Sequence, residues 1–202
     1  LIQQHRQFAT KRLDEFARAL TKERLDVEAT AIEVGHPADA IVRKANEIGA
    51  DLILMGAGEK SLFEHFLLGP VASSVVQHAT HPVLAIRPGD PAVKFHNILC
   101  PVDQSSVSAR GLLNAIRLTH AFRGHLVVLS VVPWSHWLAM AVQTKTLADA
   151  MDEHDRRWRD DFEQFLKTCS FGDVSWESEV RSGAPHEEII AAAQKHQADL
   201  IV

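Results

Sequence analysis

Residues 35–54 read GHPADAIVRKANEIGADLIL, and residues 183–202 read GAPHEEIIAAAQKHQADLIV. The two stretches align without a gap at an offset of 148 residues, which is the distance from Gly35 to Gly183. An offset of this size corresponds to a whole domain, whereas solenoid repeats are roughly 20–50 residues long. The sequence therefore predicts two copies of one module in tandem.

The repeat also leads us to expect that both copies are incomplete. The second copy opens with an apolar stretch at Asn97, and the offset of 148 residues puts its counterpart about fifty residues before Leu1. The second copy stops at Val202, before any counterpart of residues 55–88. We expect the C-terminal part of the first module over residues 1–88, a linker over residues 89–96, and the N-terminal part of the second module over residues 97–202.

Composition points to a soluble globular protein. The 202 residues are 46% hydrophobic and 23% charged, which is ordinary for such proteins. A net charge of −5 argues against nucleic-acid partners and against an anionic membrane surface. No apolar run reaches the roughly 18–20 residues that cross a bilayer. Cys100 and Cys169 form no disulfide framework, which favours a reducing compartment, and we expect a cytoplasmic protein.

The spacing of apolar residues predicts strands that alternate with helices. Such alternation indicates an α/β protein with a doubly wound parallel sheet, covered by helices on both faces. We expect helices over 7–25, 37–48, 70–78, 106–122, 147–166 and 184–195, and strands over 26–34, 51–55, 83–86, 98–102, 126–132, 174–180 and 200–202.

Ligands of such sheets bind beyond the carboxyl ends of the strands, where the strand order reverses. This rule directs attention to Pro101–Asp103, to Val131–Pro133 and to the loop after Met55. That loop contains Gly56 and Gly58, and Gly69 opens a helix further along. Glycines let backbone N–H groups approach phosphate closely, and a helix N-terminus adds partial positive charge. The alternative is that these glycines only turn the chain.

Several motifs resemble the universal stress protein family. Residues 50–56 (ADLILMG), 66–69 (FLLG) and 75–84 (VVQHATHPVL) resemble the C-terminal half of its module. Residues 98–103 (ILCPVD) resemble the family's first strand, and residues 129–132 (LSVV) resemble its second. The resemblance implies an adenine nucleotide α-hydrolase-like fold, a regulatory role in stress response with slow or no catalysis, and, in some members, binding of ATP or AMP. It also implies dimers formed through the last strand of the module, here Val83, Leu84, Ala85 and Ile86.

In ATP-binding members the phosphate signature is Gly, two residues, Gly, nine residues, Gly, then Ser or Thr. Gly56 and Gly69 match the outer glycines, but the middle glycine falls at Glu59, next to Gly58, and the hydroxyl residue falls at Pro70. A carboxylate at Glu59 repels phosphate, and Pro70 offers neither a hydroxyl nor an N–H group. We therefore do not expect a triphosphate site in the first module.

The second module keeps the adenosine side of the pattern. By resemblance, Asp103 is the acid that approaches adenine or ribose, and Val131 is the residue whose backbone contacts adenine. Together with Pro101 and Val102 they form the predicted adenosine site. A helix cap before Ser105 is the alternative role for Asp103, and the two roles are compatible. The phosphate loop of this module would follow Val202.

Other functions are weaker alternatives on the same residues. They are a nucleotide-free interaction scaffold, a cytosolic regulatory domain of a larger protein such as a transporter, and an adenylyl transferase. The last would need a glycine-rich loop after its first strand, and PVDQS at residues 101–105 has none. Trp134 and Trp137 either stack on a base or pack against the following helix. His78 and His81 lack the further ligands of a zinc site, and we expect no metal.

Overall fold

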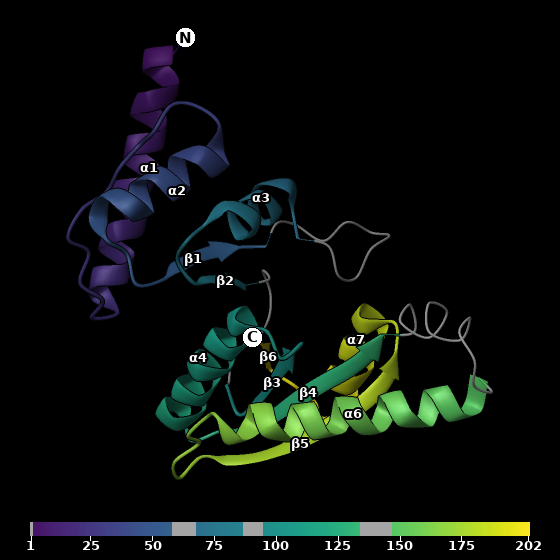
Figure 1. Cartoon of the computed structure of the whole chain (residues 1–202). Coiled ribbons are helices and arrows are strands. Elements are labelled where there is room, and N and C mark those ends of the chain that lie inside the picture. The colour runs from purple at the N-terminus through teal and green to yellow at the C-terminus, as the bar shows by residue number, and fades with distance from the viewer. Residues whose placement is uncertain (1, 58–67, 87–94, 134–146) are drawn as a thin grey trace. The chain divides into compact units, whose positions relative to one another are not determined.

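The structure, a computed structural model, describes residues 2–57, 68–86, 95–133 and 147–202. The chain divides into two compact units, Leu1–Asp90 and Pro91–Val202, and each has its own strands and core (Figure 1). Gly58, Glu59, Trp134 and Trp137 lie outside the described residues.

The first unit contains a two-stranded parallel sheet that shares its core with the helices over residues 37–48 and 70–78. Its elements are α1 (Ile2–Lys22), α2 (Pro37–Ile48), β1 (Ile53–Gly56), α3 (Pro70–His78) and β2 (Val83–Ile86). β1 and β2 pair in parallel, with Ile53 opposite Val83. The core joins Ala38 and Ala45 of α2 to Ile53 of β1 and Val75 of α3.

The ends of α2 follow from its sequence. Pro37 stands in the first turn, where the missing N–H group costs nothing, and Gly49 ends the helix in the left-handed conformation with φ of 63°. In the second unit Pro185 has the same place at the start of its helix, as the alignment of the two stretches predicts.

The strand predicted over residues 26–34 is wrong. These residues pair with no strand in the described part of the chain, and Val34 is 80% exposed. The alternation of apolar and polar residues was suited to a strand, but a strand also needs a neighbouring edge for its backbone hydrogen bonds. Residues 26–34 make no such pairing with the described strands of the first unit.

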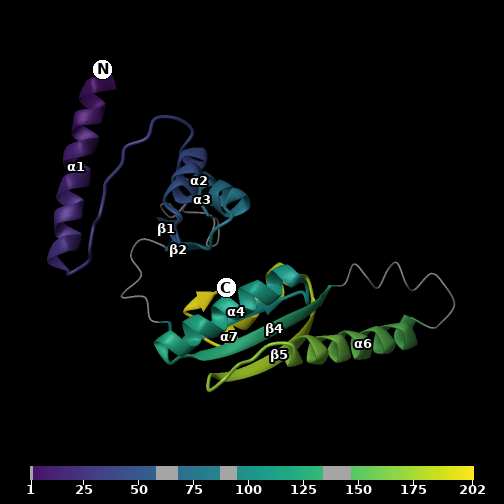
Figure 2. The same ribbon diagram turned by 60° about the vertical axis from the view of Figure 1, so that its left-hand side comes forward.

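The second unit has the predicted doubly wound form. Its elements are β3 (Asn97–Val102), α4 (Ser106–Phe122), β4 (His125–Pro133), α6 (Leu147–Lys167), β5 (Ser175–Gly183), α7 (Pro185–Lys195) and β6 (Leu200–Ile201). The strand order is β5-β4-β3-β6, and every neighbouring pair is parallel. Figure 2 shows the same strands from a second side, with α6 running beside β5 as in Figure 1.

Both faces of this sheet are covered, which explains the nearly continuous apolar runs of β3 and β4. On one face, Ile98 and Cys100 of β3 join the core formed with α4 and α6. On the other face, Leu99 of β3 packs with Leu129 of β4 and Ala192 of α7. Cys100 is 1% exposed, and burial raises the pKa of its thiol to about 12.

The order of strands reverses at β3. The chain passes from β3 to β4 on one side and reaches β6 on the other side only at its end. The carboxyl ends of β3 and β4 therefore lie at the position where ligands of doubly wound sheets bind.

Among the residues that the structure describes, no helix is both long enough and apolar enough to cross a membrane.

Candidate functional site

A cleft of about 480 Å³ opens at the carboxyl ends of β3 and β4, within the range usual for small-molecule sites. Its floor comes from the two strand ends, and its walls come from the first turns of α4 and α7 and from one residue of α6. The lining residues are Pro101, Val102, Asp103, Ser105, Val107, Ser108, Leu129, Val131, Pro133, Trp158, Pro185 and Ile189. The structure thus brings together the four residues singled out in the second module, Pro101, Val102, Asp103 and Val131.

Asp103 is exposed just before the first turn of α4, and its carboxylate is hydrogen-bonded to the start of that helix. Its Oδ1 accepts a hydrogen bond from the backbone N–H of Ser105 at 3.1 Å. The Ser105 hydroxyl in turn accepts from the backbone N–H of Ser108 at 3.1 Å, so Ser105 is the N-cap of α4. Hydrogen bonds from the Ser105 and Ser108 side chains lower the pKa of Asp103. The carboxylate is therefore ionised at neutral pH, and it keeps free lone pairs for a ligand.

Two residues of the site were missed from the sequence. Ser130 of β4 is fully buried, and its hydroxyl donates to the carbonyl oxygen of Val102 at 3.2 Å. The indole Nε1–H of Trp158 on α6 donates to the same hydroxyl oxygen at 2.9 Å. A signal was present in the sequence, because Trp158 stands four residues before Phe162 on the apolar side of the predicted helix.

The turn between β3 and α4 is held against α6 as well. Gln104 has φ of 64°, an uncommon value for a residue other than glycine. Its side-chain Nε2 donates to the backbone carbonyl of Trp158 at 3.4 Å. The turn that carries Asp103 is therefore linked to the helix on the opposite wall of the cleft.

The cleft has apolar walls and a single ionised group. The residues that line it, all in the described part of the chain, include Asp103 as the one acid and no Lys, Arg or His. Such a lining suits a neutral, planar ligand with hydrogen-bond donors for a carboxylate. It does not suit the phosphate groups of a nucleotide, which would need donors or cations from outside this cleft.

The glycines predicted to cradle phosphate lie in the first unit. The backbone N–H of Gly69 donates to the carbonyl oxygen of Ala57 at 2.9 Å, so Ala57 lies beside the start of α3. Pro70 is the first residue of α3, as expected. Since the Gly69 N–H group is already bonded, it is not available to a phosphate oxygen. A role of Gly56 and Gly69 in phosphate binding stays a prediction.

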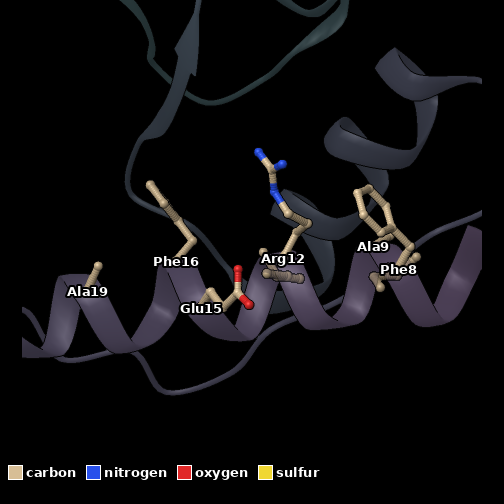
Figure 3. A pocket seen from close by; sticks show the side chains of 8 residues that line it. Phe8, Ala9, Arg12, Glu15, Phe16 and Ala19 are labelled. Atoms are coloured by element: carbon tan, nitrogen blue, oxygen red, sulfur yellow. The ribbon is translucent and has the colours of Figure 1, made fainter.

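A hollow of about 780 Å³ along α1 is larger but is not the candidate site (Figure 3). Phe8, Arg12 and Phe16 project from the same side of the helix, and the two phenylalanines are 65% and 62% exposed. The Arg12 guanidinium lies 6.0 Å from the centre of the Phe8 ring. Apart from Ile32, the lining residues all belong to α1, so no strand end reaches this hollow.

No group of three or more His, Cys, Asp and Glu side chains suited to a metal ion occurs in residues 2–57, 68–86, 95–133 and 147–202. The predicted strand at the end of the first module is present as β2, and its Val83, Leu84, Ala85 and Ile86 are half-buried. β2 pairs with β1 along one edge, and its other edge has no strand partner among the described residues.

Comparison with known proteins agrees with the two units. The model of the universal stress protein family matches residues 2–87 and again residues 94–202. A protein of Staphylococcus aureus (strain USA300) that carries a universal stress protein name is 44% identical over 63 residues. That match covers 31% of this chain, and the chain spans 37% of the length of that relative.

Solved structures share the fold. A universal stress protein from Archaeoglobus fulgidus aligns with a TM-score of 0.70 and 21% identity, over 99% of this chain and 67% of its own. One from Pseudomonas aeruginosa strain UCBPP-PA14 aligns with a TM-score of 0.66 and 21% identity, over 94% and 64%. The two matches of the family model cover nearly the whole sequence, and the chain belongs to the universal stress protein family, with two of its modules in tandem.

Proposed function

We propose that this protein binds an adenine nucleotide such as ATP or AMP through the cleft of its second unit, and that it acts as a non-catalytic regulatory protein of the cytoplasmic stress response. One observation carries the proposal. Asp103 follows β3 and Val131 lies near the end of β4, and these two residues, singled out from the sequence alone, line the same apolar cleft at the point where the strand order reverses.

The lining suggests which part of the nucleotide is held. Pro101, Val131 and Ile189 offer apolar surface to a purine ring. The Asp103 carboxylate accepts hydrogen bonds, and the ribose hydroxyls and the exocyclic amine of adenine are donors. Because no Lys, Arg or His lines the cleft among the residues that the structure describes, we expect adenosine to supply most of the binding free energy and the phosphates to supply little.

The electrostatics of Asp103 favour binding over catalysis. A general base works best when its pKa is near the working pH, and the pKa of Asp103 is lowered from its ordinary value. We therefore expect ATP to be bound without rapid hydrolysis. Release of inorganic phosphate, followed over hours at saturating ATP, measures this directly.

Substitution of Asp103 tests the site. We expect Asp103→Asn to weaken the binding of adenosine and AMP about tenfold, because a hydrogen bond to a charged acceptor is worth roughly 1.5–3 kcal/mol. Isothermal titration calorimetry of both ligands provides the measurement. Asp173→Asn is the matched control, since that carboxylate is 85% exposed and does not line the cleft. Equal affinities of the Asp103→Asn and Asp173→Asn proteins would refute the assignment.

A nucleotide-free interaction scaffold is the second candidate. It is favoured by the first unit, where Pro70 opens α3 and the Gly69 N–H group is already bonded. The same titration separates the two functions. Absence of heat from ATP, AMP and adenosine at millimolar concentration would favour the scaffold.

A further inference from the structure

Trp158 lines the cleft, whereas the apolar residues that follow it on α6 pack in the core. Phe162 and Leu166 follow it at intervals of four residues, and they are 2% and 9% exposed in the core between α6 and the sheet. Trp158 is only half-buried and lines the cleft. The ring thus continues the apolar stripe of α6 beyond the core and into the binding space.

The indole of Trp158 is held by a hydrogen bond at its edge and by a neighbouring ring. Its single donor, Nε1–H, is satisfied by the hydroxyl of buried Ser130 at 2.9 Å, and that hydroxyl donates to Val102 at 3.2 Å. The Trp158 backbone carbonyl accepts from Gln104 at 3.4 Å. On the helix, the His154 ring lies 6.0 Å away at an interplanar angle of 29°. Because the ring is already held in place, its flat surface can contact a ligand with little further loss of side-chain entropy on binding.

The first unit has no aromatic residue at the corresponding helix position. The offset of 148 residues puts Thr10 of α1 opposite Trp158 of α6. An aromatic residue at this position is therefore a property of the second unit and not a general requirement of the helix.

We infer that Trp158 is a specificity-determining residue that selects a planar aromatic ring, the base of the nucleotide, and that Ser130 is the positioning residue that fixes its indole. This inference rests on the proposed function, because it assigns the base to the Trp158 side of the same cleft. Stacking on aromatic side chains favours purines over smaller or non-aromatic groups.

Affinity for adenosine tests the selection. We expect Trp158→Leu to weaken adenosine binding about tenfold, and Trp158→Phe to restore most of it, because the phenyl ring keeps an aromatic face. Trp176→Leu is the matched control: Trp176 is 38% exposed, stacks on Phe171 at 3.9 Å and does not line the cleft. Equal weakening by Trp158→Leu and Trp158→Phe, or by Trp158→Leu and Trp176→Leu, overturns the inference.

Fluorine NMR of the otherwise unaltered chain keeps the test independent of folding. With 5-fluorotryptophan in all four positions, the Trp158 resonance is the one absent from the Trp158→Phe spectrum. We expect adenosine to shift this resonance and to leave that of Trp176 in place, and we expect Ser130→Ala to broaden the Trp158 line and reduce its shift. Calorimetric binding of adenosine with no change at Trp158 overturns the inference and leaves the proposed function standing. No binding of adenosine or AMP by the wild-type chain overturns both.

Discussion

In the turn between β3 and α4, the carboxylate of Asp103 accepts one backbone hydrogen bond and still has lone pairs that can accept hydrogen bonds from a ligand. Its carboxylate receives the N–H of Ser105, and Ser105 caps the helix that borders the cleft. The cap and the ligand role, which the sequence left as alternatives, are therefore compatible in this geometry. The helix start is ordered before any ligand arrives, and Asp103 needs little rearrangement to accept one.

Loss of the cap should be measurable as stability. We expect Ser105→Ala to lower the free energy of unfolding by about 1 kcal/mol, because the Ser108 N–H group loses its side-chain acceptor. Urea denaturation followed by circular dichroism provides the value. Ser106→Ala, one residue further on and exposed, is the control for the loss of a hydroxyl. Equal effects of the two substitutions would contradict the capping role.

Among the secondary-structure elements, β5 and α7 are joined by a cluster of ion pairs around Glu179. Its carboxylate accepts from His196 at 2.6 Å and from Lys195 and Arg181 at 2.9 Å each. Arg181 also reaches Glu188 of α7 at 3.3 Å. Burial alone would raise the pKa of Glu179, but the hydrogen bonds from these three partners outweigh it and lower the pKa to about 2.

The cluster predicts a pH-dependent stability. Since the pKa of Glu179 is about 2 in the folded chain and 4.5 as an ordinary value, its contribution is complete above pH 4.5 and disappears as the pH falls towards 2. We expect Glu179→Gln to lower the free energy of unfolding at pH 7 by about 2 kcal/mol. The difference from wild type should shrink as the pH is lowered through this window.

Denaturant unfolding at several pH values measures this difference. Glu187→Gln is the control, because the Glu187 side chain is 74% exposed at the start of the same helix. A Glu179→Gln deficit that stays constant between pH 7 and pH 3 would contradict the linkage.

The elements also show how far the sequence could predict the structure. The parallel sheet followed from buried strands such as residues 98–102 and from the caps around them, because periodicity and turn residues are local signals. The strand over residues 26–34 was wrong because pairing depends on a neighbour that no local pattern reveals. Asp103 and Val131 were found through motifs at strand ends. Trp158 was missed because it is far along the chain from β3 and β4, and no local pattern indicates its hydrogen bond to Ser130 of β4.

At the scale of the whole molecule, the described residues of the two units contain different motifs of the family's module. The first has the glycines Gly56 and Gly69 of the phosphate signature, with Pro70 at the start of α3. The second has the apolar cleft with Asp103 and the indole of Trp158. We propose that the first unit self-associates through β2, whose outer edge has no strand partner among the described residues.

The hydrogen bonds of β2 indicate how to test that association. The carbonyl oxygen of Pro82 accepts a hydrogen bond from the N–H of Ile53, and that of Ile86 accepts one from the N–H of Ala57. Because backbone groups of alternate residues in a strand point to the same edge, the N–H group of Ala85 points away from β1, towards the open edge of β2. We expect Ala85→Pro to remove this outward donor, leave the β1–β2 pairing intact and convert a dimer to a monomer. Light scattering after size exclusion measures the mass, with Ala85→Ser, which keeps the N–H group, as the control. A dimer that survives Ala85→Pro with unchanged dissociation would show that another surface holds the two chains together, because a strand edge without that donor pairs poorly.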